Sequence, residues 1–192
     1  QFFKWYFLFK IFKNAYNNNG CDATEMPPNG KNGESAKLSD TKITAAGSTN
    51  RIDLSVFYPA QDFSISEFAI YCSTDVIGAF YHILVYDDLN GVPNNLLYES
   101  GNLDCSTIGL KSEVNAFNFA RGVKYWVGTH SSSTASLHAI SVNALIPLST
   151  RSTLTSYNTA YRVTSAFGTA PSPITGGTLS FVSHSQVLML IA

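Results

Sequence analysis

Charged residues are scarce in this chain. Asp, Glu, Lys and Arg together make up 13% of its 192 residues, about half of the ~25% that is usual in soluble proteins. The formal net charge is −1 at pH 7, so the chain lacks the strongly basic balance with which nucleic-acid-binding proteins attract phosphate. We therefore exclude DNA and RNA as main partners. A surface rich in Ser, Thr and Asn is suited to stable packing against other subunits.

Cysteine is also rare. Cys21, Cys72 and Cys105 are too few and too widely spaced for a disulfide framework or a zinc site. We expect two buried thiols and one in a loop, because free cysteine usually packs as a small hydrophobic residue. The sequence has no Asn-x-Ser/Thr acceptor, which disfavours a glycosylated extracellular domain.

Long uninterrupted apolar runs are missing as well. A transmembrane helix needs about 20 mostly apolar residues, whereas the most aromatic stretch, residues 1–16, is interrupted by Lys4, Lys10 and Lys13. The three lysines do not share one helical face, and no cleavage pattern of small residues follows. The segment therefore matches neither an interfacial membrane helix nor a signal peptide, and we predict no membrane insertion.

Aromatic residues are concentrated in this N-terminal segment. They include Phe2, Phe3, Trp5 and Phe9. An exposed segment so rich in large apolar rings would aggregate, so it must be buried against a neighbouring chain or its own domain. We interpret residues 1–16 as a docking segment that makes subunit contacts, with an N-terminal strand of the same domain as the alternative.

Residues 17–47 separate the docking segment from the rest of the chain. Asn, Gly and Pro recur so densely in this stretch that no regular element is expected to persist across it. We predict a flexible linker or extended arm here. The remaining residues, 48–192, are long enough for one β-sandwich domain.

Short strand-like runs separated by turns dominate that domain. Residues 51–58 alternate between apolar and polar side chains, and two alternating sets within residues 63–72 are one residue out of phase. The change of phase predicts a β-bulge near Ser66 and Glu67. About nine strands without helix-length apolar stripes favour an all-β, antiparallel sandwich of jelly-roll type with an extended N-terminal arm. Further runs of this kind are 81–86, 96–98, 122–128, 137–140, 144–148, 161–167 and 187–191.

One turn has a superficial likeness to a calcium loop. Asp87, Asp88 and Asn90 precede Gly91, but the ligand spacing and the terminal Glu of an EF-hand are missing. An Asp or Asn followed by Gly is the commonest turn between antiparallel strands. We therefore interpret these residues as a hairpin turn.

Residues with catalytic chemistry are scattered along the chain. The four histidines, His82, His130, His138 and His184, lie in four different segments. Neither a nucleophile elbow nor a carboxylate pair for glycoside hydrolysis is recognisable. We predict no catalytic residue, no metal site and no cofactor, and we interpret the chain as non-enzymatic.

Two adjacent aromatic residues occupy one predicted strand. Alternation sends the rings of Tyr125 and Trp126 to opposite faces. A tryptophan within a strand is usually a core anchor, so we expect Trp126 in the core and Tyr125 on the surface. Tyr125 is then a candidate for carbohydrate stacking.

The C-terminal run of five apolar residues, 187–191, leaves no polar face for water. A strand of this composition is expected to be buried on both faces. We do not expect other parts of a single sandwich to bury both faces of a strand near the end of the sequence. We therefore predict that Leu188 and Leu190 make subunit contacts.

Several short motifs follow one another in the central part of the chain. They are Phe57-Tyr-Pro59, Phe68-Ala-Ile70, Ile83-Leu-Val-Tyr-Asp87, Asn90-Gly-Val-Pro93, Leu96-Leu97, Gly109-Leu-Lys111, Lys124-Tyr-Trp126 and Leu137-His-Ala-Ile140. In this order they resemble the β-sandwich module of tailed-bacteriophage virion proteins, which recurs in tail fibres, tail-associated proteins and head fibres. The resemblance covers roughly residues 49–169, and the docking segment lies outside it.

The resemblance implies a structural protein of a virion, a fibre or appendage subunit on the tail or capsid. It implies no cofactor and no catalytic residue. The expected partners are other virion structural proteins, further copies of the chain in a homotrimer, and a glycan or receptor on the host surface. The alternative is a carbohydrate-binding module of a secreted bacterial protein, which would bind glycans as an isolated monomer.

Overall fold

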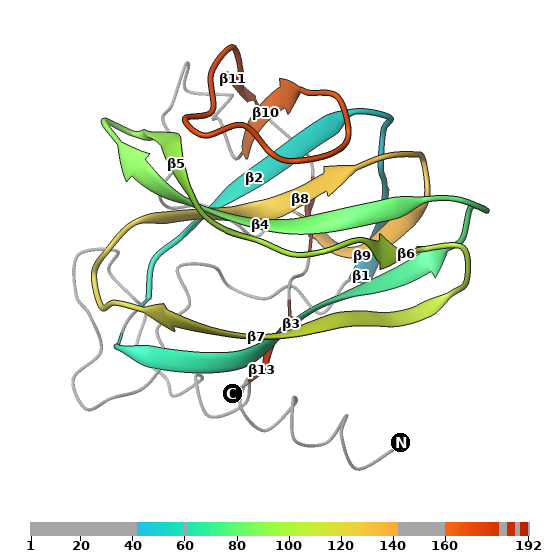
Figure 1. Cartoon of the computed structure of the whole chain (residues 1–192), viewed down its shortest axis with the longest axis horizontal. Helices are drawn as coiled ribbons and strands as arrows, with labels where there is room; N and C mark the ends of the chain where they lie inside the picture. Colours follow the sequence, from blue (N-terminus) through green and yellow to red (C-terminus); the bar gives the residue numbers. More distant parts are fainter. Residues whose placement is uncertain (1–41, 60, 142–159, 181–183, 187–188, 192) are drawn as a thin grey trace.

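The structure is a computed structural model that describes residues 42–59, 61–141, 160–180, 184–186 and 189–191. All regular structure in these residues is β-strand, and every pairing between strands is antiparallel. The strands form two sheets that lie one above the other (Figure 1). The prediction of an all-β fold with two antiparallel sheets is confirmed, while the jelly-roll connectivity stays a prediction.

The first sheet has seven strands. Its order is β11 (Thr178–Ser180), β10 (Ala160–Thr164), β2 (Arg51–Phe57), β8 (Tyr125–Ser131), β4 (Phe80–Leu89) and β5 (Val92–Glu99), with β6 (Leu103–Asp104) also paired to β4. The predicted runs at 51–58, 81–86, 96–98, 122–128 and 161–167 all contribute strands to this sheet.

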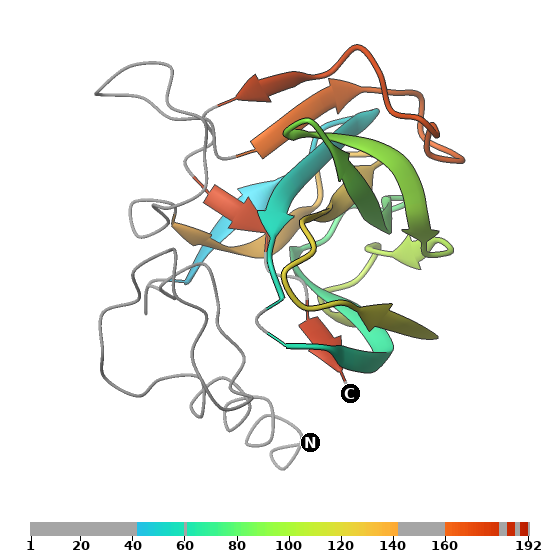
Figure 2. The same cartoon turned by 90° about the vertical axis from the view of Figure 1, so that its left-hand side faces the viewer.

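The second sheet has six strands. Its order is β1 (Lys42–Ala46), β9 (Ser136–Ser141), β3 (Phe63–Thr74) and β13 (Met189–Ile191), with β12 (His184–Gln186) paired to β9 and β7 (Gly109–Phe119) paired to β3. The side view shows β13 beside β3 (Figure 2), where it pairs with Glu67, Phe68 and Ala69.

The main hydrophobic core lies between the sheets, and we call it the inter-sheet core. It combines β3, β7 and β9 of one sheet with β4, β5, β6 and β8 of the other. Its largest fully buried side chains are Phe68, Ile70, Tyr81, Ile83, Phe119 and Leu137.

The seven-stranded sheet is covered on its outer face too. A second cluster, the outer cluster, contains Ile52, Leu54, Leu84, Tyr86, Trp126, Tyr161, Val163, Ala170 and Ile174. Segment 165–177 crosses this face after β10, and it is fixed there by the Tyr86 hydroxyl, which donates to the Pro171 carbonyl at 2.8 Å. The backbone N–H of Leu96 donates to the Ser172 hydroxyl at 3.0 Å. Because β4 has cover on both faces, it is buried continuously from Tyr81 to Tyr86.

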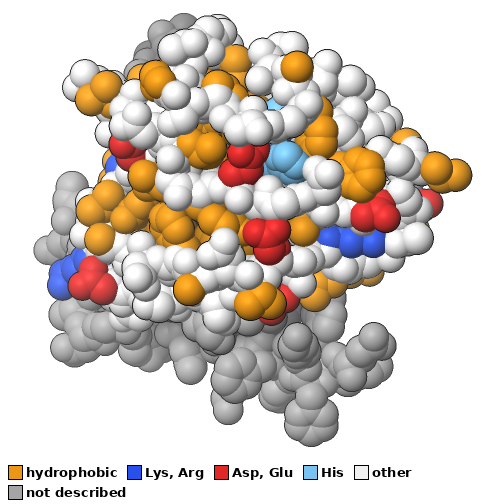
Figure 3. Space-filling view, in the orientation of Figure 1, with side chains coloured by type: hydrophobic (Ala, Val, Ile, Leu, Met, Phe, Trp, Pro, Cys, Tyr) orange, Lys and Arg blue, Asp and Glu red, His pale blue; other side chains and the backbone are white. Residues whose placement is uncertain are grey.

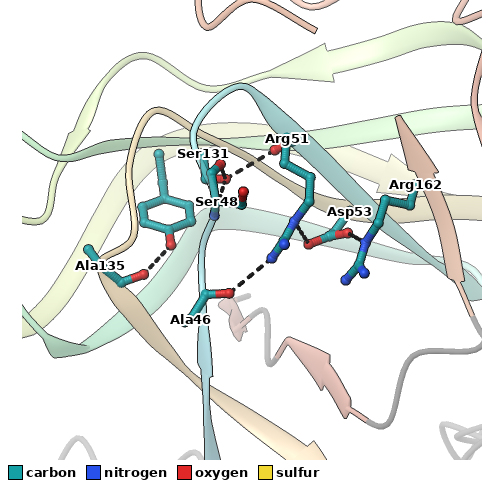
Figure 4. Close-up of polar contacts among 8 residues, drawn as sticks. Ala46, Ser48, Arg51, Asp53, Ser131, Ala135 and Arg162 are labelled. Atoms are coloured by element: carbon teal, nitrogen blue, oxygen red, sulfur yellow. Dashed lines mark hydrogen bonds and ion pairs between the residues drawn. The ribbon is translucent and has the colours of Figure 1, made fainter. Parts of the chain in front are cut away.

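An ion pair joins β2 to β10 on the face of the seven-stranded sheet opposite to the outer cluster (Figure 4). The carboxylate of Asp53 accepts hydrogen bonds from Nε of Arg51, at 2.8 Å, and from Nε of Arg162. Nearby, the Ser131 hydroxyl donates to the carbonyl oxygens of Ser48 and Arg51. These contacts connect the first residues of β2 to the end of β8 and to the middle of β10.

Two local predictions are confirmed in detail. The register between β3 and β7 shifts between Ile65 and Glu67, where the sequence predicts a bulge. The β4–β5 connection is a tight hairpin in which Asn90 and Gly91 both have positive φ, 54° and 89°. Positive φ at both central residues defines the type I′ turn that Asn-Gly favours.

Five of the described strands were not expected: β1, β6, β7, β11 and β12. β1 occupies residues 42–46 of the predicted linker, so the linker boundary at residue 47 is wrong for these residues. Its backbone pairs along its whole length with β9, and this pairing overrides the turn-rich composition that precedes it. β7 was missed because its apolar and polar residues do not alternate regularly, and apolar side chains such as Leu110 and Val114 are exposed. The predicted run at 144–148 lies outside the described residues.

Candidate functional site

The register of the seven-stranded sheet brings two histidines together. His82 of β4 lies directly opposite His130 of β8, and residues opposite each other in an antiparallel pair project from the same face. Glu99 of β5 lies opposite Leu84, which is two residues along β4 from His82. Because side chains at i and i+2 share a face, Glu99 joins the two histidines on the outer side of the sheet.

The three side chains form a compact cluster. One ligand atom from each of His82, Glu99 and His130 lies within 4.8 Å of the others. His82 Nδ1 is 2.9 Å from Glu99 Oε1, and its Nε2 is 2.7 Å from Asn102 Oδ1. His130 Nε2 is 3.0 Å from the carbonyl oxygen of Ser165. These polar contacts hold both imidazole rings in defined orientations.

The cluster is largely shielded from water. His130 is fully buried and His82 is 7% exposed. The ring of Phe167 lies 4.5 Å from the His82 ring and 5.1 Å from the His130 ring, measured between centroids. The backbone N–H of Ala170 donates to Glu99 Oε1 at 2.9 Å. Segment 165–170 therefore covers the site and shares its polar contacts.

Burial controls the protonation of His130. Desolvation lowers the pKa of His130 below its usual value of 6.5, and repulsion from His82 adds to this effect. The hydrogen bond to the Ser165 carbonyl, the charge of Glu99 and the nearby backbone of Gly168 oppose it. The net lowering favours the neutral imidazole, which has a lone pair free to accept a proton or bind a metal ion.

Histidine atoms reach the surface beside acidic side chains on the face seen in Figure 3. Uncharged polar and apolar side chains lie around them on the same face. A partly accessible group of imidazole and carboxylate side chains is chemically suited to binding a cation. The sequence prediction of no metal site did not anticipate this cluster.

The prediction that Tyr125 exposes its ring is wrong. Tyr125 is only 6% exposed, and its ring packs edge-on against Phe119 with centroids 5.1 Å apart. Its hydroxyl accepts the backbone N–H of Ala120 at 3.1 Å. Alternation does send Tyr125 and Trp126 to opposite faces, but both faces of β8 are covered, the one by the inter-sheet core and the other by the outer cluster. A ring in this position offers no face to a sugar.

Trp126 is a core residue, as predicted. It is 3% exposed and belongs to the outer cluster. Its indole N–H donates to Asp88 Oδ1 at 2.7 Å. Lys124 Nζ lies 2.7 Å from the same oxygen and 4.9 Å from the centroid of the Trp126 ring. The hairpin turn and the start of β8 are thus joined through one carboxylate.

The contacts of Asp88 agree with its interpretation as a turn residue. In addition to Lys124 and Trp126, its carboxylate accepts the backbone N–H of Gly91 at 3.1 Å. Burial alone would raise the pKa of Asp88, but these hydrogen bonds and the charge of Lys124 outweigh burial and lower the pKa below its usual value of 3.8.

Asp88→Asn is expected to reduce the free energy of unfolding by about 1 kcal/mol at pH 7. A carboxyl group whose pKa is lowered in the folded state stabilises the fold above its usual pKa, and this contribution is lost as the pH falls through the folded-state pKa. The difference between the two proteins should therefore shrink when urea denaturation is repeated well below pH 3.8. Asp75→Asn, which removes a carboxylate from an exposed position, is the control. A pH-independent difference would contradict the argument.

Of the residues predicted to make subunit contacts, one lies within the described residues and five lie outside them. Leu190 lies in β13, opposite Phe68 of β3 in the same chain. Leu188, Phe2, Phe3, Trp5 and Phe9 lie outside the described residues. Their subunit contacts stay predictions.

Two of the cysteines are buried free thiols, as expected. Cys72 and Cys105 are both fully buried in the inter-sheet core, and Cys72 Sγ lies 3.8 Å from the Cys105 carbonyl oxygen. Desolvation, reinforced by the neighbouring Cys72, raises the pKa of the Cys105 thiol to about 12. The thiol is therefore protonated and unreactive at neutral pH. Cys21 lies outside the described residues.

Fold and site together define an all-β protein with two antiparallel sheets and a buried imidazole–carboxylate cluster on the outer face of one of them. No protein-family model, curated protein or solved structure matches the chain. In the part of the chain that the structure describes, no helix has the length and apolar character to cross a membrane.

Proposed function

We propose that the chain is a non-enzymatic structural subunit of a bacteriophage virion, a fibre or appendage protein of the tail or capsid that contributes to host attachment. The observation that carries the proposal is the way in which the motifs of the resemblance fit together. The hairpin at residues 87–93 and the Lys124-Tyr-Trp126 motif meet at Asp88. Two of the motifs behind the resemblance therefore belong to one structural unit, which supports treating them as parts of one module.

A second observation supports assembly with further chains. β7 is an edge strand, because within the described residues it pairs only with β3. Two of its large apolar side chains are exposed, Val114 at 82% and Leu110 at 47%. Unpaired backbone groups beside exposed apolar side chains favour pairing with another chain. The proposed trimer would bury this edge together with the docking segment.

The carbohydrate-binding alternative lacks its stacking platform. Tyr125 is buried, and every Phe, Tyr and Trp among the described residues is either buried or half-buried. Binding modules for sugars normally present an aromatic ring to the ligand. A glycan array probed with the full chain tests the alternative, because strong binding by a monomer would support it over the virion subunit.

Deletion of residues 1–20 is expected to convert the trimer into a folded monomer. The deleted part contains the aromatic docking segment, whereas both described hydrophobic clusters lie wholly beyond it. Light scattering should give three times the mass of one chain for the full protein and a single mass for the deletion variant. Cooperative thermal unfolding of the variant is the control for folding. A monomeric full-length chain would contradict the assembly argument.

The position of the gene provides an independent test of the virion assignment. Genes for portal, capsid or tail proteins are expected beside it. A location within a cluster of secreted carbohydrate-active enzymes would contradict the assignment and favour the binding module.

A further inference from the structure

The His82–Glu99–His130 cluster has the chemistry of a metal centre. Two imidazoles and one carboxylate are a ligand set that zinc uses with one coordination position left for water. Softer thiolate ligands are absent from this cluster, and an all-oxygen set for calcium or magnesium is absent too. We propose that these three side chains bind one divalent transition-metal ion of the zinc class. The proposal does not depend on the proposed function.

The hydrogen bonding of His130 supports a bound cation. Its Nε2 lies 3.0 Å from the Ser165 carbonyl, an acceptor, so the proton of the neutral ring resides on Nε2. The other nitrogen, Nδ1, then carries a lone pair. Nδ1 is buried and is the one buried side-chain nitrogen or oxygen among the described residues that has no hydrogen-bond partner. A coordinated metal ion would satisfy it.

The contacts of His82 lead to the same conclusion. Both of its nitrogens face oxygen acceptors, Glu99 Oε1 at 2.9 Å and Asn102 Oδ1 at 2.7 Å. A neutral imidazole has one N–H and can satisfy only one of them. With a metal ion bound to Nδ1 and to Glu99, the remaining N–H on Nε2 still donates to Asn102. This arrangement satisfies every polar atom of the ring.

The surroundings have the features of an outer coordination shell. Metal-binding histidines usually donate their second N–H to a carbonyl or carboxylate oxygen, which fixes the ring. The Ser165 carbonyl and Asn102 Oδ1 occupy these positions for His130 and His82. Phe167 packs at a tilt against both rings and excludes water from one side.

The ligand spacing requires only a small adjustment. Ligand atoms bound tetrahedrally at about 2.0–2.2 Å from zinc lie about 3.4 Å apart, whereas the three ligand atoms here lie within 4.8 Å. Glu99 has the most exposed side chain of the three, 17%, and can move towards the ion. A bound ion would join β4, β5 and β8 and fix segment 165–170 through Ser165 and Ala170.

The test uses the full chain after removal of metal with a chelator. Calorimetric titration with ZnCl₂ should show saturable binding of one ion per chain and a raised thermal midpoint. His82→Gln and Glu99→Gln should each weaken zinc binding at least tenfold. His138→Gln is the matched control, because His138 also lies in a strand but stacks on Tyr71 in the other sheet, and its affinity should equal that of the wild type.

Cobalt substitution identifies the ligands without relying on any variant. Co²⁺ bound to the wild-type chain should give the intense visible bands of a four-coordinate site, without the ultraviolet charge-transfer band of a thiolate ligand. A thiolate band would assign the binding to cysteine and overturn the proposal. So would the absence of saturable zinc binding, or equal zinc affinity in the wild type and Glu99→Gln.

Discussion

Trp126→Ala is expected to lower the free energy of unfolding by about 3–5 kcal/mol, the usual cost of truncating a large buried aromatic side chain. The ring is 3% exposed and packs edge-on to Tyr161 with centroids 6.2 Å apart. Truncation would open a cavity in the outer cluster and remove the indole donor from Asp88. Because Asp88 also binds Lys124, the connection between the hairpin and β8 would weaken at the same time.

Trp126→Phe separates the contribution of apolar packing from that of the indole hydrogen bond to Asp88. It keeps most of the apolar volume and removes the indole N–H, so about 1–2 kcal/mol should be lost. Urea denaturation of the three proteins at one pH provides the measurement. A loss below about 1 kcal/mol for Trp126→Ala would place the ring at the surface and contradict its burial.

Those features of the fold that depend only on residues close together in the sequence could be predicted from it. The bulge near Glu67 follows from a change of phase in the apolar alternation, and the turn at Asn90 and Gly91 follows from backbone preferences. Trp126 could be assigned to the core from its place in a strand. Each of these predictions needs only a few consecutive residues, because period and turn chemistry are local properties.

Burial of Tyr125 could not be predicted in the same way. Alternation correctly separates its ring from that of Trp126, but it does not say how many faces of a sheet are covered. Segment 165–177 covers the outer face of β8 and the six-stranded sheet covers the inner one. The ring of Tyr125 faces the six-stranded sheet and packs on Phe119. Cover of both faces, by a second sheet and by a segment about 40 residues away in sequence, is a tertiary property that no local pattern reports.

The metal-site candidate was missed for a related reason. His82 and His130 are 48 residues apart in sequence and become neighbours only through the register of β4 with β8. A shift of that register by one residue would send one of the rings to the opposite face. The sequence contained one usable signal, since each histidine lies in or beside a predicted strand. Strand order and register would have been needed to join them.

Gly128→Ala is expected to lower the free energy of unfolding by about 3 kcal/mol or more. Gly128 lies in β8 between β2 and β4, opposite Leu54 and Leu84. A Cβ atom there would lie 1.9 Å from the Asp53 carbonyl oxygen and 2.8 Å from the Leu54 Cα. Both are backbone atoms of the adjacent strand, so no side-chain rotation can relieve the clash. β2 would have to move away from β8.

The consequences should extend along β8 in both directions. Trp126 and His130 lie two residues on either side of Gly128, so a displaced β2 would loosen the outer cluster and the imidazole pair together. Gly101→Ala is the matched control, because its nearest neighbour would be the flexible end of the Glu113 side chain, at 3.0 Å. That variant should lose less than about 1 kcal/mol. Equal losses for both variants in urea denaturation would show that β2 and β8 do not approach closely at Gly128, and the strand pairing that positions His130 would have to be revised.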